Sequence, residues 1–135
     1  MPLDELVDLS KLRIENARKL LATSQSLIDA GDYKSSAKSS YYSIFNAMRA
    51  CLALDMIDHK RHSGVISDFR LHYIKNGKLK PELSDIITAL FNVRNQSDYN
   101  DFYVISKEDV ERQLANARVF VNEVGSLLGG LWNDE

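Results

Sequence analysis

The chain is poor in the residues that constrain or interrupt a polypeptide. A single cysteine, Cys51, excludes an intramolecular disulfide and fits a reducing compartment. Two prolines and six glycines among 135 residues exclude a collagen-like or low-complexity chain. No apolar run reaches the ~18 residues needed to cross a bilayer, and Asp4 and Glu5 stand where a signal peptide would carry basic residues. We therefore expect a cytoplasmic protein without a membrane segment.

The chain does have the composition of a globular protein. Hydrophobic residues make up 44% of it and charged residues 27%, which is close to the average for soluble domains. A chain of this length usually folds as one domain around one core. We expect a single domain over residues 1–135, with its core at about 9–128.

Apolar residues recur at three- and four-residue steps in long segments, which is typical of amphipathic helices. No segment shows sustained strand alternation. The sequence thus predicts an all-α fold, an up-and-down four-helix bundle with one additional short helix. The expected helices are a first over 9–30, ended by Gly31; a second after Asp32; a short third from His62 to Asn76; a fourth from Pro81 into a polar cluster; and a fifth from Ser106 to Leu128.

Small side chains form a stripe along the second predicted helix, beside its apolar face. Such side chains allow another helix to approach closely, and a helix from a second subunit could cover them. Tyr41 and Tyr42 on the same helix are interpreted as core and dimer contacts, and Cys51 as a packing residue. The stripe consists of Ser36, Ser40, Ser43, Ala47 and Ala50.

Basic residues are concentrated in one window, although the net charge of the chain is −2. Residues 59–80 contain six lysines and arginines, one acidic residue and all three histidines. A one-sided basic region could bind phosphate; it is also typical of a solvated surface. His59 and His62 are three residues apart, but no cysteine lies near them, so we predict neither a metal site nor a cofactor.

The polar segment from Arg94 to Asp101 is the clearest candidate site. Arg94, Asn95, Asp98 and Tyr99 fall within two helical turns and could bind phosphate or transfer protons. Each has a structural alternative. Arg94 and Asp98 are four residues apart and could form an intrahelical ion pair. Tyr99 could be a core aromatic, and Asn95 a polar residue at the helix end.

Three stretches, in their order and spacing, resemble the HEPN (higher eukaryote and prokaryote nucleotide-binding) family, in particular its small stand-alone prokaryotic branch. The resemblance covers roughly residues 10–128. The stretches are AKSSYYSIFNA at 37–47; KRHSGV at 60–65 followed by Phe69; and RNQSDY at 94–99 followed by the helix from Ser106, which contains ARVFV at 117–121.

The resemblance implies a bundle of four or five helices that forms a homodimer, with the polar end of the fourth helix in a cleft between the subunits. Many relatives are metal-independent ribonucleases whose motif is an arginine, often a polar residue, and a histidine after four to six residues. Others act with a small nucleotidyltransferase as toxin and antitoxin. Arg94 and Asn95 match the start of the motif. Tyr99 stands at the histidine position, and Asp101 stands where some relatives carry a modified tyrosine.

The missing histidine bears on catalysis. Metal-free RNA cleavage needs a group that takes a proton from a ribose 2′-hydroxyl near pH 7, and imidazole suits this because its pKa lies near 6.5. The phenol of Tyr99, with a reference pKa near 10, is a poor base unless a cation such as Arg94 lowers that value. His62 either faces phosphate alongside Lys60 or only shapes the entry to the third helix.

Two hypotheses of function follow from the resemblance. In the first, the protein is the HEPN component of a nucleotidyltransferase-linked toxin–antitoxin system and binds RNA or nucleotide at the end of the fourth helix. In the second, it is an active metal-independent ribonuclease toxin: Arg94 stabilises the phosphorane charge, Asn95 orients the scissile phosphate, and Asp98 or Tyr99 replaces the missing histidine. The expected binding residues are Lys60, His62, Arg94 and Asn95.

Overall fold

The structure is a computed structural model that describes residues 2–133. These residues form an all-helical bundle without strands, so the predicted fold class is confirmed. The elements are α1 (Leu3–Asp29), α2 (Tyr33–Leu54), α3 (His62–Phe69), the π-helical turn η1 (Arg70–Ile74), α4 (Glu82–Tyr99) and α5 (Lys107–Asn133).

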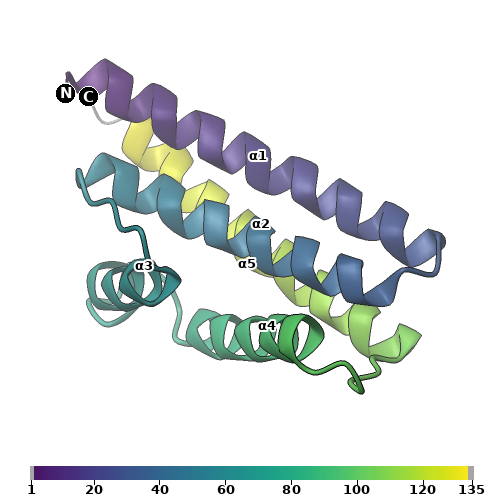
Figure 1. Cartoon of the computed structure of the whole chain (residues 1–135). Helices are drawn as coiled ribbons and strands as arrows, with labels where there is room; N and C mark the ends of the chain where they lie inside the picture. The colour runs from purple at the N-terminus through teal and green to yellow at the C-terminus, as the bar shows by residue number, and fades with distance from the viewer. Residues whose placement is uncertain (1, 134–135) are drawn as a thin grey trace.

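Helix α2 is the centre of the bundle. It packs against α1, α3, α4 and α5; Figure 1 shows α1 on one side of it, α3 and α4 on the other, and α5 behind. The start of α1 and the end of α5 lie together at one end of the molecule (Figure 1). The α1–α2 turn and the α4–α5 connection lie at the opposite end. This arrangement places the polar end of α4 beside the first turns of α2.

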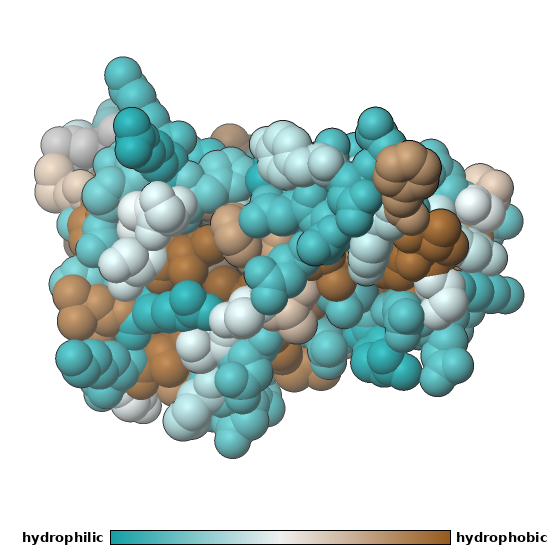
Figure 2. Space-filling view, turned by 60° about the horizontal axis from the view of Figure 1, so that its bottom comes forward, coloured by the Kyte–Doolittle hydropathy of each residue, from teal (hydrophilic) through white to brown (hydrophobic). Residues whose placement is uncertain are grey.

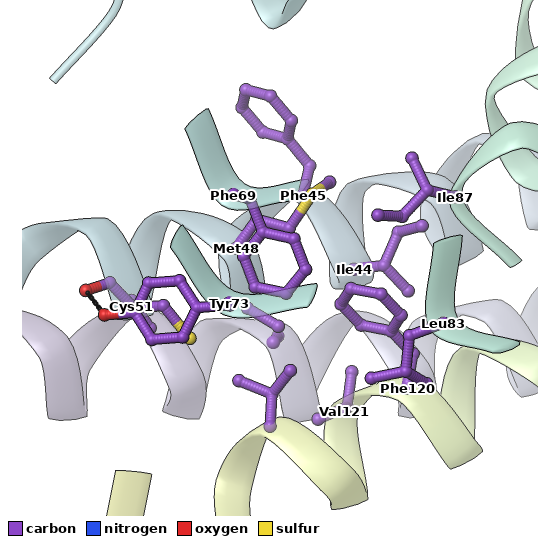
Figure 3. Close-up of a cluster of buried hydrophobic side chains, with 14 of the residues drawn as sticks. Ile44, Phe45, Met48, Cys51, Phe69, Tyr73, Leu83, Ile87, Phe120 and Val121 are labelled. Atoms are coloured by element: carbon purple, nitrogen blue, oxygen red, sulfur yellow. Dashed lines mark hydrogen bonds between the residues drawn. The ribbon is translucent and has the colours of Figure 1, made fainter. Parts of the chain in front are cut away.

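The core surrounds α2 because that helix is apolar or small on nearly all sides. Fourteen of its 22 residues are buried, which requires neighbours on every face. Figure 3 shows the central cluster, where α2 meets Phe69 of α3, Tyr73 of η1 and residues of α4 and α5. The Tyr73 hydroxyl lies 2.9 Å from the Cys51 carbonyl oxygen and 2.7 Å from an Asp55 carboxylate oxygen, which ties η1 to the end of α2. Cys51 is fully buried, as expected of a packing residue.

The small-residue stripe of α2 is covered by α1 of the same chain. The Ser24 hydroxyl of α1 lies 2.7 Å from the hydroxyl oxygens of both Ser36 and Ser40. All three serines are fully buried, so the two helices approach closely enough for hydroxyl groups to pair across the seam. A tight turn at Gly31, with φ +80°, returns the chain for this packing. The expectation that a second subunit covers this stripe is therefore wrong.

The expected helix boundaries need four corrections, one of which is that α5 continues past Leu128 to Asn133. α1 begins at Leu3 instead of residue 9, because Leu6 and Val7 are already buried against the bundle. The third helix passes into a π-helical turn after Phe69. α4 ends at Tyr99, so the last residues of the polar cluster, 100 and 101, lie in the connection to α5. None of the helices within residues 2–133 has the length and hydropathy of a membrane span.

Both predicted helix caps are present. Asp32 accepts a hydrogen bond from the Ser35 backbone N–H at 3.3 Å, and the Ser106 hydroxyl accepts one from the Asp109 N–H at 3.0 Å. The apolar seam expected for α5 is also confirmed. Its members, each at most 1% exposed, are Val110, Leu114, Ala117, Val121, Val124 and Leu128.

Candidate functional site

Arg94 lies near the end of α4 with its guanidinium held on three sides. Its Nη2 donates to the Tyr42 hydroxyl at 3.0 Å, and its Nη1 donates to Asn95 Oδ1 at 3.2 Å. Its Nε lies 2.9 Å from Asp98 Oδ2, in an ion pair outside hydrogen-bond angles. The side chain is 16% exposed. Because a guanidinium has five N–H groups, each Nη nitrogen keeps one further N–H.

Asp98 joins Arg94 to a second cation, Lys38 of α2. Its Oδ1 lies 2.8 Å from the Lys38 ammonium, while its Oδ2 faces Arg94. The Asp98 side chain is only 19% exposed, so water screens these pairs less than surface pairs. The intrahelical ion pair suggested by the sequence is thus present, within a cluster of net charge +1. Since both oxygens are engaged by cations, Asp98 is better placed to hold Arg94 than to transfer a proton.

Two tyrosines of α2 lie against Arg94. Its guanidinium carbon is 5.6 Å from the Tyr41 ring centre and 5.7 Å from the Tyr42 ring centre, both within cation–π range. Burial by itself lowers the pKa of Arg94, but the hydrogen bond to Tyr42 and the Asp98 carboxylate raise it above its usual value. Arg94 is therefore both fixed in position and permanently charged.

His62, the first residue of α3, lies against the same aromatic face of α2. Its ring stacks on Phe45 with 4.1 Å between centroids, and its Nδ1 lies 2.9 Å from the Tyr41 hydroxyl. Burial lowers the pKa of His62, and the positive charges of Arg94 and Arg49 lower it further. The imidazole is consequently neutral at pH 7. These contacts fit both alternatives for His62, so its role toward phosphate stays a prediction.

Asn95 and Tyr99 face a shallow surface pocket beside Arg94. The pocket has a volume of about 310 Å³ and is completed by Gln96 and Asn100. Tyr99 is 78% exposed, so it is not a core aromatic. Three amide side chains can hydrogen-bond to the edge of a planar ligand, and the exposed ring can stack on its face.

Lys60 is not brought to this cluster. It is exposed in the segment between α2 and α3, and no hydrogen bond or ion pair with it occurs in the described part of the chain; its role in binding stays a prediction. Other residues of the basic window are engaged elsewhere. Arg70 donates to the Ser84 hydroxyl at 3.0 Å, and Lys80 lies 3.1 Å from Glu123. Arg70 and Lys80 therefore have partners within the chain, and whether the rest of the window binds phosphate stays a prediction.

A larger hollow of about 450 Å³ lies between α3 and α4. Ile66, Ile87 and Phe91 give it an apolar lining, and serine and threonine hydroxyls lie among them. Figure 2, which brings the α3 and α4 side of the molecule forward, shows brown hydrophobic atoms in hollows between hydrophilic atoms. No group of three or more His, Cys, Asp or Glu side chains within residues 2–133 is placed to hold a metal ion.

Sequence reasoning missed Lys38 and assigned Tyr42 to the core and a dimer contact. The signal was present, because Lys38, Tyr42, Phe45 and Arg49 follow one another at four-, three- and four-residue steps and so share one face of α2. The spacing of residues along α2 does not show, however, that α3 and α4 of the same chain cover this face. We name the cluster of Lys38, Tyr41, Tyr42, Arg94, Asn95 and Asp98 the Arg94 site.

Comparison with known proteins places this arrangement in a family. The chain matches the HEPN domain family over residues 10–127. It is 35% identical over 121 residues to "Putative toxin MJ0142" of Methanocaldococcus jannaschii, which covers 90% of this chain and 82% of that protein. "Putative toxin MJ0605" of the same organism is 29% identical over 85% of each chain. A "UPF0332 protein" of Archaeoglobus fulgidus is 30% identical over 90% of this chain and 93% of its own. The chain belongs to the HEPN domain family.

Proposed function

We propose that this chain is a toxin-type HEPN protein that binds single-stranded RNA at the Arg94 site. The observation that carries the proposal is the Arg94 guanidinium, which is charged, fixed by Tyr42, Asn95 and Asp98, and left with free N–H groups. A planar guanidinium matches two oxygens of a phosphodiester. The names of two relatives contain the word toxin, which supports the toxin part of the proposal.

The surroundings of Arg94 favour unpaired RNA over an isolated phosphate or a duplex. The neighbouring pocket offers the amides of Asn95, Gln96 and Asn100 together with the exposed ring of Tyr99. Sequence-tolerant binding of single strands combines cationic contacts to phosphate with base stacking on aromatic rings. In a duplex the base faces are already stacked on one another, so no base face would be available to stack on the Tyr99 ring.

We further propose that the protein forms a homodimer and that a nucleotidyltransferase is its antitoxin partner. Phe102 and Val104, in the connection after α4, are 93% and 87% exposed. Contact between two copies there would remove apolar surface from water directly beside the Arg94 site. The resemblance to the stand-alone prokaryotic branch supports the choice of partner. Co-purification of the chain with the candidate nucleotidyltransferase tests this part.

The Arg94→Ala substitution should abolish most RNA binding. We expect the affinity for a fluorescent single-stranded RNA to fall by about tenfold or more, because a desolvated charge-assisted pair is lost. The slope of log affinity against log salt concentration should also decrease by roughly 0.7 if one phosphate contact disappears. Fluorescence anisotropy in buffer that contains EDTA measures both quantities.

Arg118→Ala is the matched control for charge. Arg118 lies on α5 and donates to Gln25 of α1 at 3.2 Å. Figure 1 shows α1 and α4 on opposite sides of α2. The substitution removes the same positive charge without touching the Arg94 site, so RNA affinity should stay near that of the unaltered protein. Equal losses in the two variants would show that binding reflects overall charge, and the proposed site would be wrong.

A further inference from the structure

An imidazole lies close to Arg94, although the histidine position of the α4 motif holds Tyr99. His62 of α3 meets Tyr42 edge-on, with 5.8 Å between ring centroids, and its Nδ1 lies 2.9 Å from the Tyr41 hydroxyl. Arg94 lies over the same two tyrosine rings. Two neighbouring residues of α2 therefore contact both a neutral imidazole from α3 and a fixed guanidinium from α4, and the two groups are near enough for the Arg94 charge to lower the pKa of His62.

The His62 ring is held in place at one of its two nitrogens and on one of its two faces. Stacking on Phe45 at 4.1 Å fixes the ring plane, and the contact with Tyr41 fixes Nδ1. No hydrogen bond to Nε2 occurs within residues 2–133, and the ring is only partly buried. The other two histidines are placed elsewhere, since His59 pairs with Asp68 and His72 belongs to η1.

We propose that His62 is the general base of a metal-independent RNA cleavage at the Arg94 site; this inference rests on the proposed binding of RNA there. Nε2 of His62 takes the proton of a ribose 2′-hydroxyl while the 2′-oxygen forms a bond to phosphorus. The bond between phosphorus and the 5′-oxygen breaks, and the leaving oxygen takes a proton from water. The hydroxide that remains removes the proton from His62. The products are a 2′,3′-cyclic phosphate and a 5′-hydroxyl end.

The two helices contribute different parts of this step. Arg94 of α4 stabilises the additional negative charge on the phosphorane, because its position and charge are set before the substrate arrives. His62 of α3 supplies the proton acceptor. Asp98, whose two oxygens face Lys38 and Arg94, acts as a positioning residue for the guanidinium. His62 thus takes the role of proton acceptor, for which the sequence had suggested Asp98 or Tyr99.

The surroundings of His62 set the protonation state that a base requires. In the tautomer with hydrogen on Nδ1, that N–H donates to the Tyr41 oxygen, and Nε2 carries the lone pair. The titratable and charged groups that face the ring are Tyr41, Tyr42 and Arg49 of α2 and Arg94 of α4. Burial and the two arginines hold the pKa of His62 below its usual value, so the base is available at pH 7.

The test measures RNA binding and RNA cleavage by the full chain, in EDTA, between about pH 5 and pH 8. We expect the cleavage rate to rise with pH through one ionisation below 6.5 and then to level off. His62→Gln should bind RNA with an affinity within about threefold of that of the unaltered protein. Its cleavage rate should be at least about 100-fold lower. Added imidazole should restore part of the rate in His62→Ala, which a structural role would not allow.

His72→Gln is the matched control, because it removes an imidazole from η1 and should change neither binding nor cleavage. An RNA without the 2′-hydroxyl at the cleaved position should bind and stay intact. Binding without any cleavage would overturn the role of His62 and leave the proposed RNA binding in place; no binding at all would overturn both. A rate independent of pH in the unaltered protein overturns the inference even if His62→Gln does not fold.

Discussion

Arg94 combines charge with rigidity because its partners come from two helices. Asn95 and Asp98 belong to α4, whereas Tyr42 reaches the guanidinium from α2. A free surface arginine has about 2 kcal/mol of rotamer entropy to lose when it is immobilised on a ligand. Folding has already imposed that loss on Arg94. The same argument explains why lysine would be a poor replacement, since it keeps the charge but not the planar, two-pronged geometry.

The Asp98→Asn substitution should separate stability from RNA affinity. It removes the partner of both Lys38 and Arg94, and we expect the free energy of unfolding to fall by about 1 kcal/mol. The net charge of the cluster rises from +1 to +2, so RNA should bind more tightly at low salt. Urea unfolding and fluorescence anisotropy measure the two effects.

Asp101→Asn is the control for stability, because Asp101 is exposed and no ion pair with it occurs within residues 2–133. Its free energy of unfolding should match that of the unaltered protein. Asp98→Asn also tests how protons are transferred. If Asp98→Asn binds RNA but loses all cleavage while His62→Gln still cleaves, Asp98 itself transfers the proton, and the assignment to His62 is contradicted.

At the scale of elements, the seam between α1 and α2 is unusual because hydroxyl groups hold it together. Ser24 bonds Ser36 and Ser40, and Ser10 of α1 donates to the Ala50 carbonyl at 2.8 Å. Burying a hydroxyl group costs free energy unless it has a hydrogen-bond partner. The seam matters for function because it holds the face of α2 that carries Lys38 and the two tyrosines toward α4.

Ser24→Ala should destabilise the protein without altering the Arg94 site. The Ser40 hydroxyl loses its partner in α1 and stays buried, so we expect the free energy of unfolding to fall by about 1–2 kcal/mol. Urea denaturation measures this, with an unchanged slope against denaturant. Thr23→Ala is the control, because Thr23 is exposed and bonds only Lys19 of its own helix. Equal stability of the two variants would show that side-chain packing alone holds the seam.

At the scale of the whole molecule, the Arg94 site lies where the last turns of α4 meet the first half of α2. Figure 1 shows that α4 ends and α2 begins toward the end of the bundle that carries the α1–α2 turn and the α4–α5 connection. Residues from α2 and α4 form the site, and the first residue of α3 reaches its tyrosines. The exposed side chains of Phe102 and Val104 follow directly after α4. RNA binding and association of two copies would therefore use neighbouring surfaces.

The Phe102→Asp substitution should convert a homodimer into a monomer. The Phe102 side chain is 93% exposed, so a charge there costs the single copy little, but it would be buried in an interface between copies. Light scattering at micromolar concentration measures the mass, and circular dichroism should show an unchanged helical bundle. Val119→Asp is the control, since Val119 is also exposed, at 42%, but lies on α5. A monomeric unaltered protein would contradict the proposed dimer.

The sequence by itself determined the helical elements and the location of the candidate site. Apolar side chains at three- and four-residue steps predict which faces are buried, and the cap residues predict where helices begin, because both depend on neighbours within a few residues. The start of α1 was missed, since Leu6 and Val7 lie outside the longer apolar pattern. The position of Arg94 and Asn95 and their resemblance to the HEPN motif were readable for the same local reason.

Only the tertiary structure decided which side chains meet at the site. Arg94 reaches Tyr42 across 52 residues, and His62 reaches Tyr41 across 21. These contacts depend on which face of α2 turns toward α3 and α4, and that in turn depends on α1 covering the serine stripe on another face. Packing between helices is a property of whole surfaces, so the spacing within one helix predicts that a face is buried but not what covers it.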